Sequence, residues 1–434
     1  MTGASDKYSF KRIVADWIKQ RLGESGIFKY YLIPRARIKQ LRNIIRIRRA
    51  RKVKIVFLVG SLSMWRFQRL YELLKQDARM ELGIAVYPFP GSAESQKNDV
   101  NNLLRFFSDK GISVLNLFGE SSPGRVLKER ENPDIIFYPQ PYNYLYGNDL
   151  DAQFFDDTLV CYIPYALLVI REAWVDRNRL NDVAWRIFYP TEERKRQALP
   201  ALYNKGSNIR ITGDPMFDSF SASGCSADAW KPQDKQKKRI IWAPHFSLQE
   251  ADLLHRTSFQ WLSAAMLSIA NRYKERIQFS FKPHPRLYKA LCEMPEWGLL
   301  RTEDYYRQWA EGENTQLDVG PYVDLFKESD AMIHDCGSFS VEYLFTKNPV
   351  LFTAKDLNAV CAQLNQLGLD AIKVHYACDS EQGVVNFIED VVFGGSDPLK
   401  AEREAFYQKH LLPPQGRSVA ENIYNEIITG LGLK

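Results

Sequence analysis

The chain has 434 residues, 45% of them hydrophobic and 13% aromatic, so it can bury the cores of two or three domains and is not expected to be disordered. Its six cysteines form no CxxC pair and no Cys/His cluster, which argues against a disulfide framework and structural zinc and favours a reducing, cytoplasmic location. There is no apolar run of about 18 residues, and the first residues lack the apolar core of a signal peptide, so we expect neither a membrane span nor secretion.

The net charge of +6 conceals a strongly basic N-terminal segment. Residues 1–54 hold sixteen Lys and Arg against three acidic residues, a balance of +13, which leaves −7 for the remainder (42 basic, 49 acidic). Within residues 1–52, apolar side chains at helical spacing are surrounded by basic ones. The apolar residues are Ile38, Leu41, Ile44 and Ile45, and the basic ones are Arg37, Arg42, Arg46, Arg48, Arg49, Arg51 and Lys52.

This pattern predicts a basic amphipathic helix that lies on the anionic inner face of the cell membrane, where each basic group adds about 1 kcal/mol. The alternatives are a helix that packs on its own domain and a nucleic-acid-binding segment. We disfavour nucleic acid as a partner, because the charge turns acidic immediately after the segment instead of staying basic over the fold.

From Lys52 onward, short apolar runs alternate with amphipathic stretches, which is typical of parallel α/β sheets. We predict a first α/β domain at 53–218 with helices near 64–75, 101–110 and 124–130. No GxGxxG follows its first strand, so the common dinucleotide fingerprint is absent. The strands predicted in this domain are Val53–Val59, Ile84–Tyr87, Ser113–Leu117, Ile135–Tyr138 and Thr158–Ile163.

A polar linker, residues 219–238, precedes a second strand series. We predict a second α/β domain at 236–415 with helices near 251–273, 322–328, 338–345 and 357–367. Residues 416–434 are expected to form a C-terminal helix that packs back on the first domain. The strands predicted in the second domain are Arg239–Ala243, Ile277–Phe281, Ala331–His334 and Val350–Thr353.

Polar side chains collect where three of these strands end, which is where parallel α/β domains bind ligands. The ends read Trp242-Ala243-Pro244-His245, Lys282-Pro283-His284-Pro285-Arg286 and His334-Asp335-Cys336-Gly337-Ser338. Two cations and an imidazole on a proline-stiffened turn suit a phosphate or diphosphate, and the alternative is a solvated basic turn. Gly337 and Ser338 precede an expected helix whose free N–H groups could receive phosphate oxygens, and ordinary helix capping is the alternative.

Four blocks in this order resemble the CDP-glycerol glycerophosphotransferase family, which makes teichoic acids and related capsule polymers. They are APHF (243–246), KPHPR (282–286), SDAMIHDCGSFSVEYLFTKNPVLF (329–352) and GRSVAENI (416–423), and the resemblance covers roughly residues 158–430. Asp335, Ser338 and Glu342 fall on the family's Ser-Asp-x-x-Ser block and the acidic residue after it, and His284 falls on its His-Pro site. Residues 213–218 are similar to its GxPRxD turn, with Met216 in place of arginine.

The resemblance implies a GT-B fold, an α/β architecture of two doubly wound Rossmann-type domains that face each other across a cleft. The implied donor is a CDP-alcohol carrying glycerol or ribitol phosphate, and a hydroxyl of a lipid-linked or glycan acceptor attacks its phosphorus to release CMP. No cofactor or metal is implied. The expected catalytic residues are His284, His245 and Asp335, and the expected donor-binding residues are Lys282, Arg286, Gly337, Ser338, Glu342 and Pro244.

The sequence departs from the family where the first domain usually has a His-Gly-x-Pro turn. The corresponding stretch, residues 161–166, has no histidine, and neither does any position before His245. His245 is therefore our candidate base, with a structural histidine as the alternative. Gly337 also replaces a common serine, and Gln415 replaces an acid. The alternative functions are a GT-B glycosyltransferase that uses a nucleotide sugar in capsule or lipopolysaccharide synthesis, and a non-catalytic nucleotide-binding relative in a membrane-bound capsule complex.

Overall fold

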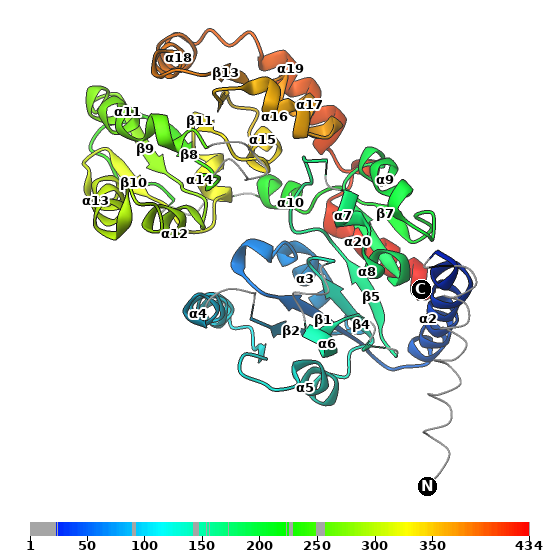
Figure 1. The fold of residues 1–434 in the computed structure, drawn as a ribbon. Helices are drawn as coiled ribbons and strands as arrows, with labels where there is room; N and C mark the ends of the chain where they lie inside the picture. Colours follow the sequence, from blue (N-terminus) through cyan, green and yellow to red (C-terminus); the bar gives the residue numbers. More distant parts are fainter. Residues whose placement is uncertain are drawn as a thin grey trace. The chain divides into compact units, whose positions relative to one another are not determined.

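A computed structural model describes residues 23, 25–88, 93–141, 147–152, 154–155, 157–171, 173–222, 224, 229–248 and 257–433. They divide into two compact units, each built on one parallel sheet (Figure 1). Unit 1 contains the described residues up to Ala166, those of 173–218 and those from Pro413 onward, and unit 2 contains 167–171 and the described residues of 219–412. The units are therefore not contiguous in sequence, unlike the ranges 53–218 and 236–415 expected from the sequence.

The sheet of unit 1 has seven parallel strands in the order β3-β2-β1-β4-β5-β6-β7, which is the doubly wound, Rossmann-type order. Its central strand β1 is fully apolar apart from Lys54, because both faces of the sheet are covered. The strands are β1 (Val53–Val59), β2 (Met80–Val86), β3 (Leu115–Asn116), β4 (Ile135–Tyr138), β5 (Leu159–Tyr162), β6 (Arg186–Tyr189) and β7 (Ile209–Ile211).

Alternate side chains of β1 enter two different cores, as the two-residue period of a strand requires. Ile55 and Phe57 lie in a core with α2, α3, α4 and α20, whereas Val56 and Leu58 lie in a core with α5, α6, α8 and α9 on the other face. The helices of this unit are α2 (Ile33–Arg48), α3 (Gln68–Lys75), α4 (Ala93–Asp109), α5 (Pro123–Arg130), α6 (Gly147–Leu150), α7 (Ala173–Asp176), α8 (Arg179–Val183), α9 (Glu192–Ala198) and α20 (Val419–Leu431), and α10 (Met216–Ser221) spans its end.

The C-terminal helix α20 packs against α3 in unit 1. Ser418 and Glu421 cap its start, and the Asp218 carboxylate accepts hydrogen bonds from the N–H groups of Val419 (2.8 Å) and Ala420 (2.7 Å). Gly213 lies beside this contact with a φ of 94°, and a Cβ atom there would come within 2.8 Å of Pro413 and Val419. The turn at 213–218 thus holds the last helix on the first sheet.

The basic helix α2 is part of unit 1 and has two different faces. Ile47 is fully buried in the core beside α20, and Ile44 packs partly against the same core. Ile38, Leu41 and Ile45 remain exposed, at 53%, 61% and 49%. The sequence stripe therefore splits, because Ile44 faces the domain while the other three residues face away from it.

Unit 2 repeats the architecture with six parallel strands in the order β10-β9-β8-β11-β12-β13. Its strands are β8 (Lys238–Ala243), β9 (Ile277–Phe281), β10 (Thr315–Leu317), β11 (Ala331–His334), β12 (Val350–Thr353) and β13 (Tyr376–Cys378). Its helices are α11 (Phe259–Arg272), α12 (Leu287–Cys292), α13 (Gly298–Glu311), α14 (Val323–Lys327), α15 (Phe339–Glu342), α16 (Leu357–Gln363), α17 (Gln366–Ile372), α18 (Glu381–Asn386) and α19 (Lys400–Phe406).

The predicted helix at 251–273 corresponds to α11, and its first part, 251–256, lies outside the described residues. Within the parts of the chain that the structure describes, no helix is both long and apolar enough to cross a bilayer. The two parallel sheets with their helices confirm the predicted α/β class.

Candidate functional site

The polar turns after β8, β9 and β11 lie side by side, because these three strands are neighbours in the sheet of unit 2. The N–H of Lys282 donates to the carbonyl of Trp242 at 2.8 Å, and the N–H of His284 donates to the carbonyl of Pro244 at 3.0 Å. Pro244 thus joins the two turns through its backbone carbonyl. The sheet pairing continues just beyond the strands and fixes the spacing of the histidine-bearing turns.

His245, Phe246, His284 and Arg286 form one cluster at these ends. The His245 and His284 rings lie 4.9 Å apart between centroids, and the Phe246 and His284 rings 4.5 Å apart. The Arg286 guanidinium lies 4.0 Å from the centre of the Phe246 ring, a cation–π contact. Arg286 is exposed, and within the part of the chain that the structure describes its guanidinium forms no ion pair. An exposed guanidinium held over an aromatic ring is well placed to meet an anionic ligand.

His284 is a neutral imidazole in this cluster. Burial, together with the nearby His245 and Arg286, lowers its pKa to about 3. Its Nδ1 atom accepts a hydrogen bond from the N–H of Arg286 at 3.1 Å, so the proton of the neutral ring lies on Nε2. His284 can therefore offer a hydrogen-bond donor to an oxygen of a ligand without carrying a positive charge.

Lys282 lies behind this cluster and already has partners. The residue is 6% exposed, and Nζ donates to Asp318 Oδ1 at 2.8 Å and to the carbonyl of Gly320 at 2.7 Å. Burial lowers the pKa of Lys282, while Asp318 acts in the opposite direction. Because Asp318 balances its charge, Lys282 holds the turn after β10 in place, and Arg286 is the more accessible cation of the KPHPR turn.

Asp335, at the end of β11, is the centre of a hydrogen-bond network. Its carboxylate accepts from the N–H of His245 (2.6 Å), the hydroxyl of Thr257 (2.7 Å), and both the N–H and the hydroxyl of Ser258. The residue is 7% exposed. Its acceptor capacity is used within the protein, so the geometry fits a residue that positions His245.

The block after Asp335 forms a shorter helix than the sequence suggested. The predicted helix at 338–345 is a single α-turn, α15, followed by a 3₁₀ turn at Tyr343–Phe345. Ser338 stands at its N-cap but makes no side-chain capping bond, whereas the Ser340 hydroxyl donates to the carbonyl of Gly337 at 2.5 Å. Gly337 and Ser338 are half-buried. Their turn offers backbone N–H groups to a ligand, without a long helix behind them.

Glu342 lies on the inner side of α15 and is 1% exposed. It accepts a hydrogen bond from the hydroxyl of Tyr322, whose ring lies 5.9 Å from Lys282 Nζ. Sequence reasoning missed Tyr322, Asp318 and Ser258 as parts of this network. Asp318 directly follows β10, the neighbour of β9, so recognition of that strand would have indicated it.

Three further residues with reactive or ionisable side chains lie outside this cluster. Cys161 is buried inside β5, and burial raises the pKa of its thiol, so it is not poised as a base or nucleophile. His334 is fully buried against His375 and takes no part in the cluster. Asp149 accepts from the N–H of Gly124 at 3.0 Å and so caps α5. Within the described residues, no group of three His, Cys, Asp or Glu side chains could hold a metal ion.

The chain was compared with known families and solved structures. Residues 172–429 match the model of the family described as CDP-glycerol:poly(glycerophosphate) glycerophosphotransferase. No curated protein sequence matches the chain. The wall teichoic acid polymerase TagF, in a variant soaked with CDPG, is similar with a TM-score of 0.60 at 14% identity, covering 92% of this chain and 98% of TagF.

Two further structures show the same fold. S. aureus MnaA in complex with UDP has a TM-score of 0.56 at 15% identity, covering 88% of this chain and 98% of MnaA. The UDP-GlcNAc 2-epimerase from Neisseria meningitidis bound to UDP-GlcNAc has a TM-score of 0.55 at 15% identity, covering 87% of this chain and 99% of the epimerase. The two-domain GT-B fold expected from the sequence is thereby confirmed.

Proposed function

Because the chain belongs to the CDP-glycerol:poly(glycerophosphate) glycerophosphotransferase family and is an enzyme of transferase type, we propose that it moves a polyol phosphate from a CDP-alcohol to an acceptor hydroxyl, with release of CMP. The donor carries glycerol or ribitol phosphate, and the product belongs to teichoic acid or capsule synthesis. In this reaction the acceptor oxygen forms a bond to the phosphorus that bears the alcohol, and the bond from that phosphorus to the bridging oxygen of CMP breaks.

The cluster of His245, Phe246, His284 and Arg286 is the observation that carries this proposal. Phosphoryl transfer depends mainly on the positioning of the donor and on neutralisation of charge on its phosphate oxygens. Arg286 supplies an accessible guanidinium, and His284 supplies a neutral Nε2–H donor beside it. In our proposal these two groups hold the diphosphate, and the turn at Gly337 and Ser338 receives a further phosphate oxygen.

We propose that His245 takes the proton of the acceptor hydroxyl, since it adjoins His284 and no histidine precedes it in the sequence. Asp335 fixes the backbone of His245 through the 2.6 Å hydrogen bond and acts as a positioning residue. Lys282 and Glu342, both buried, support the same turns through Asp318 and Tyr322. In this proposal the predicted residues form two groups. One group contacts the substrates, and the other holds the contacting residues in position.

We further propose that the acceptor is lipid-linked and that the protein lies peripherally on the inner face of the membrane. The exposed side chains of Ile38, Leu41 and Ile45 on α2 form an apolar stripe. Exposed Arg37, Arg42, Arg48 and Arg49 flank it. An apolar stripe with a basic border suits an anionic bilayer surface, where it would bring the enzyme to a lipid-linked hydroxyl.

A second candidate is sugar transfer from a nucleotide sugar. It is supported by the fold shared with MnaA and the UDP-GlcNAc 2-epimerase, whose structures hold UDP and UDP-GlcNAc. Fold alone does not select between these chemistries. A third candidate, a non-catalytic nucleotide-binding relative, is supported by the missing histidine in the first domain.

Nucleotide release distinguishes the three candidates. The protein is incubated with CDP-glycerol, CDP-ribitol and UDP-, GDP- and CMP-sugars in the presence of membrane lipid extract, and the released nucleotide is identified. The proposal predicts CMP from a CDP-alcohol together with incorporation of the polyol phosphate into lipid. UDP or GDP release would replace it with sugar transfer, as would CMP release from a CMP-sugar. A rise in melting temperature with CDP-glycerol but no release would favour the non-catalytic relative.

A further inference from the structure

Ser247 lies two residues after His245, just beyond the APHF block (243–246). The residue is 2% exposed, and its Oγ atom lies 2.6 Å from Nδ1 of His245, which is hydrogen-bond distance. A hydroxyl can donate or accept, so the direction of this hydrogen bond decides which ring nitrogen of His245 carries the proton. Ser247 therefore acts on the histidine to which we assign the base.

Four hydrogen bonds form a closed circuit through His245, Ser247, Thr257 and Asp335. The Asp335 carboxylate accepts from the N–H of His245 at 2.6 Å and from the Thr257 hydroxyl at 2.7 Å. The N–H of Thr257 donates to the carbonyl of Ser247 at 2.8 Å. The contact between Ser247 and the His245 ring completes the circuit. Asp335 thus fixes the backbone of His245, whereas Ser247 fixes its imidazole.

We propose that Ser247 is a positioning residue that accepts a hydrogen bond from Nδ1–H of His245 and so keeps Nε2 as the basic nitrogen. This role rests on the proposed transfer reaction, in which His245 takes the proton of the acceptor hydroxyl. A neutral imidazole has one N–H, so a base at Nε2 requires the proton on Nδ1. The Ser247 oxygen, at 2.6 Å, is then the acceptor for that N–H.

The contact also persists through the transfer step. The acceptor O–H bond breaks, its proton binds to Nε2 of His245, and its electron pair stays on the oxygen that bonds to phosphorus. CMP leaves with the electron pair of the bond that breaks. His245 is then an imidazolium whose Nδ1–H still donates to Ser247. In a Ser-His-Asp triad a carboxylate holds the histidine in the same way, but Ser247 is neutral, so its removal should cost less than removal of a triad aspartate.

A double-mutant cycle on the rate of CMP release tests this role. Ser247→Ala should lower kcat about threefold to tenfold, the range of one neutral hydrogen bond, and leave the KM for CDP-glycerol unchanged. In the His245→Ala background the same substitution should have no further effect on the residual rate. Ser247→Thr restores the hydroxyl and should recover the rate. Equal losses in both backgrounds would overturn the role, because Ser247 would then act on a group other than His245.

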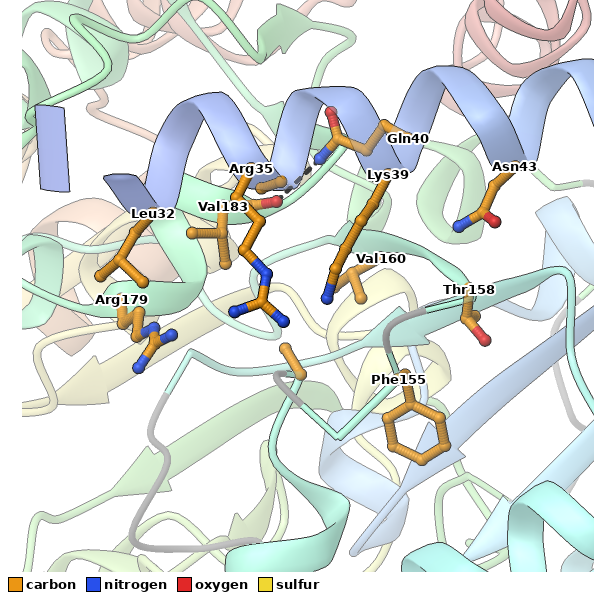
Figure 2. Close-up of a pocket in the computed structure, with 12 residues that line it drawn as sticks. Leu32, Arg35, Lys39, Gln40, Asn43, Phe155, Thr158, Val160, Arg179 and Val183 are labelled. Carbon is orange, nitrogen blue, oxygen red and sulfur yellow. Dashed lines mark hydrogen bonds between the residues drawn. The ribbon is translucent and has the colours of Figure 1, made fainter. Parts of the chain in front are cut away.

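Thr158→Val is the control, because it also removes a buried, hydrogen-bonded hydroxyl. Thr158 belongs to unit 1, where it lines a cavity beneath α2 (Figure 2), and its hydroxyl donates to the carbonyl of Pro133 at 2.9 Å. The melting temperature and the rate are measured for both variants. We expect the rate to fall in Ser247→Ala alone. A matching loss of rate in Thr158→Val would show that the rate follows stability, and it would overturn the positioning role.

A second measurement needs no turnover and so separates this role from the proposed function. The nitrogen-15 chemical shifts of an imidazole report which nitrogen carries the proton, and the His245 signals are those that disappear in His245→Ala. We expect the proton on Nδ1 in the wild type and a shift towards Nε2 in Ser247→Ala. A proton on Nε2 in the wild type would overturn the proposal, because Ser247 would then donate to Nδ1. No CMP release, with the proton on Nδ1, would remove the transfer reaction while confirming that Ser247 holds the ring.

Discussion

The backbone N–H of Arg286 donates a hydrogen bond to Nδ1 of His284 at 3.1 Å. The turn Lys282–Arg286 therefore sets the tautomer of its own histidine, with no help from a distant residue. The low pKa of His284, about 3, keeps the ring neutral at physiological pH, and the proton on Nε2 is left for a ligand. The same turn carries the exposed guanidinium of Arg286, so one short segment offers a neutral donor and a cation.

His284→Ala is expected to lower the rate of CMP release by about a hundredfold, the usual effect of removing one donor from a transition-state oxygen. His284→Gln should retain most of the rate, because its side-chain amide can place an N–H near the position of Nε2. Since the pKa of His284 is about 3, the wild type and His284→Gln should show the same pH dependence between about pH 5 and 8. An ionisation in that range that disappears in His284→Gln would show that His284 acts as an acid or base.

Arg286→Ala is expected to raise the KM for the CDP-alcohol by about tenfold to a hundredfold, which corresponds to a charge-assisted hydrogen bond of about 1.5–3 kcal/mol. Its melting temperature should not change, because the side chain is exposed. Lys289→Ala is the matched control. Lys289 lies on α12 one turn after Arg286, and it forms an ion pair with Glu293 at 3.7 Å. Equal effects of both variants on KM would mean that the general charge of this surface, and not Arg286 itself, attracts the donor.

The sequence predicted those strands whose apolar residues are continuous. β1, β4, β9, β11 and β12 have the predicted bounds, because each is buried on both faces. Four strands were not predicted. β7, β10 and β13 are three-residue segments with polar or half-exposed side chains, and β6 has only four residues, although its last three are buried. Such strands form because the neighbouring strand offers its free edge, which is a property of the assembled sheet and not of the local sequence.

The site was predictable to a similar extent. The sequence predicts that the side chains following the strand ends lie close together. His245 and His284 do lie next to each other. The partners of Lys282 and Asp335 could not be predicted, because Asp318 and Ser258 lie 36 and 77 residues away along the chain. We expected Asp335 to be a catalytic residue, and in the structure its carboxylate accepts hydrogen bonds from His245, Thr257 and Ser258 of its own domain.

Asp335→Asn tests the positioning role. The new amide would place an N–H where the protein already presents donors from His245, Thr257 and Ser258, so the free energy of unfolding should fall by about 2–3 kcal/mol. The rate of CMP release should fall while the KM for the donor changes little, because His245 is displaced and the diphosphate site is not. Thermal unfolding and steady-state kinetics measure the two effects. A selective rise in KM would return Asp335 to direct contact with the donor.

The buried His375 predicts an acid-sensitive stability. Burial lowers its pKa to about 3, whereas in the unfolded chain the pKa is about 6.5. Below about pH 6.5 the unfolded state gains a proton that the folded state does not accept, so the free energy of unfolding falls as the pH falls towards 3. His375→Gln should reduce the slope of the unfolding free energy against pH. The reduction is at most that of one bound proton, about 1.4 kcal/mol per pH unit. Denaturant unfolding at several pH values measures it, and an unchanged slope would contradict a neutral buried ring.

The exposed stripe of α2 is best tested by substitution, because deletion of the N-terminal segment would also remove Ile47 from the core of unit 1. Replacing Ile38, Leu41 and Ile45 by serine should weaken binding to phosphatidylglycerol vesicles by about tenfold or more, since each loses an apolar side chain that would enter the bilayer. The melting temperature should stay the same, because these side chains are exposed at 53%, 61% and 49%. Turnover on a water-soluble acceptor should also be preserved.

The control for this variant is Leu299→Ser/Leu300→Ser, which removes exposed apolar side chains from α13 in unit 2, where they stand at 53% and 82% exposure. It should leave vesicle binding unchanged if α2 is the membrane-facing element. Equal losses in both variants would show that apolar exposure in general, and not the basic helix, drives association.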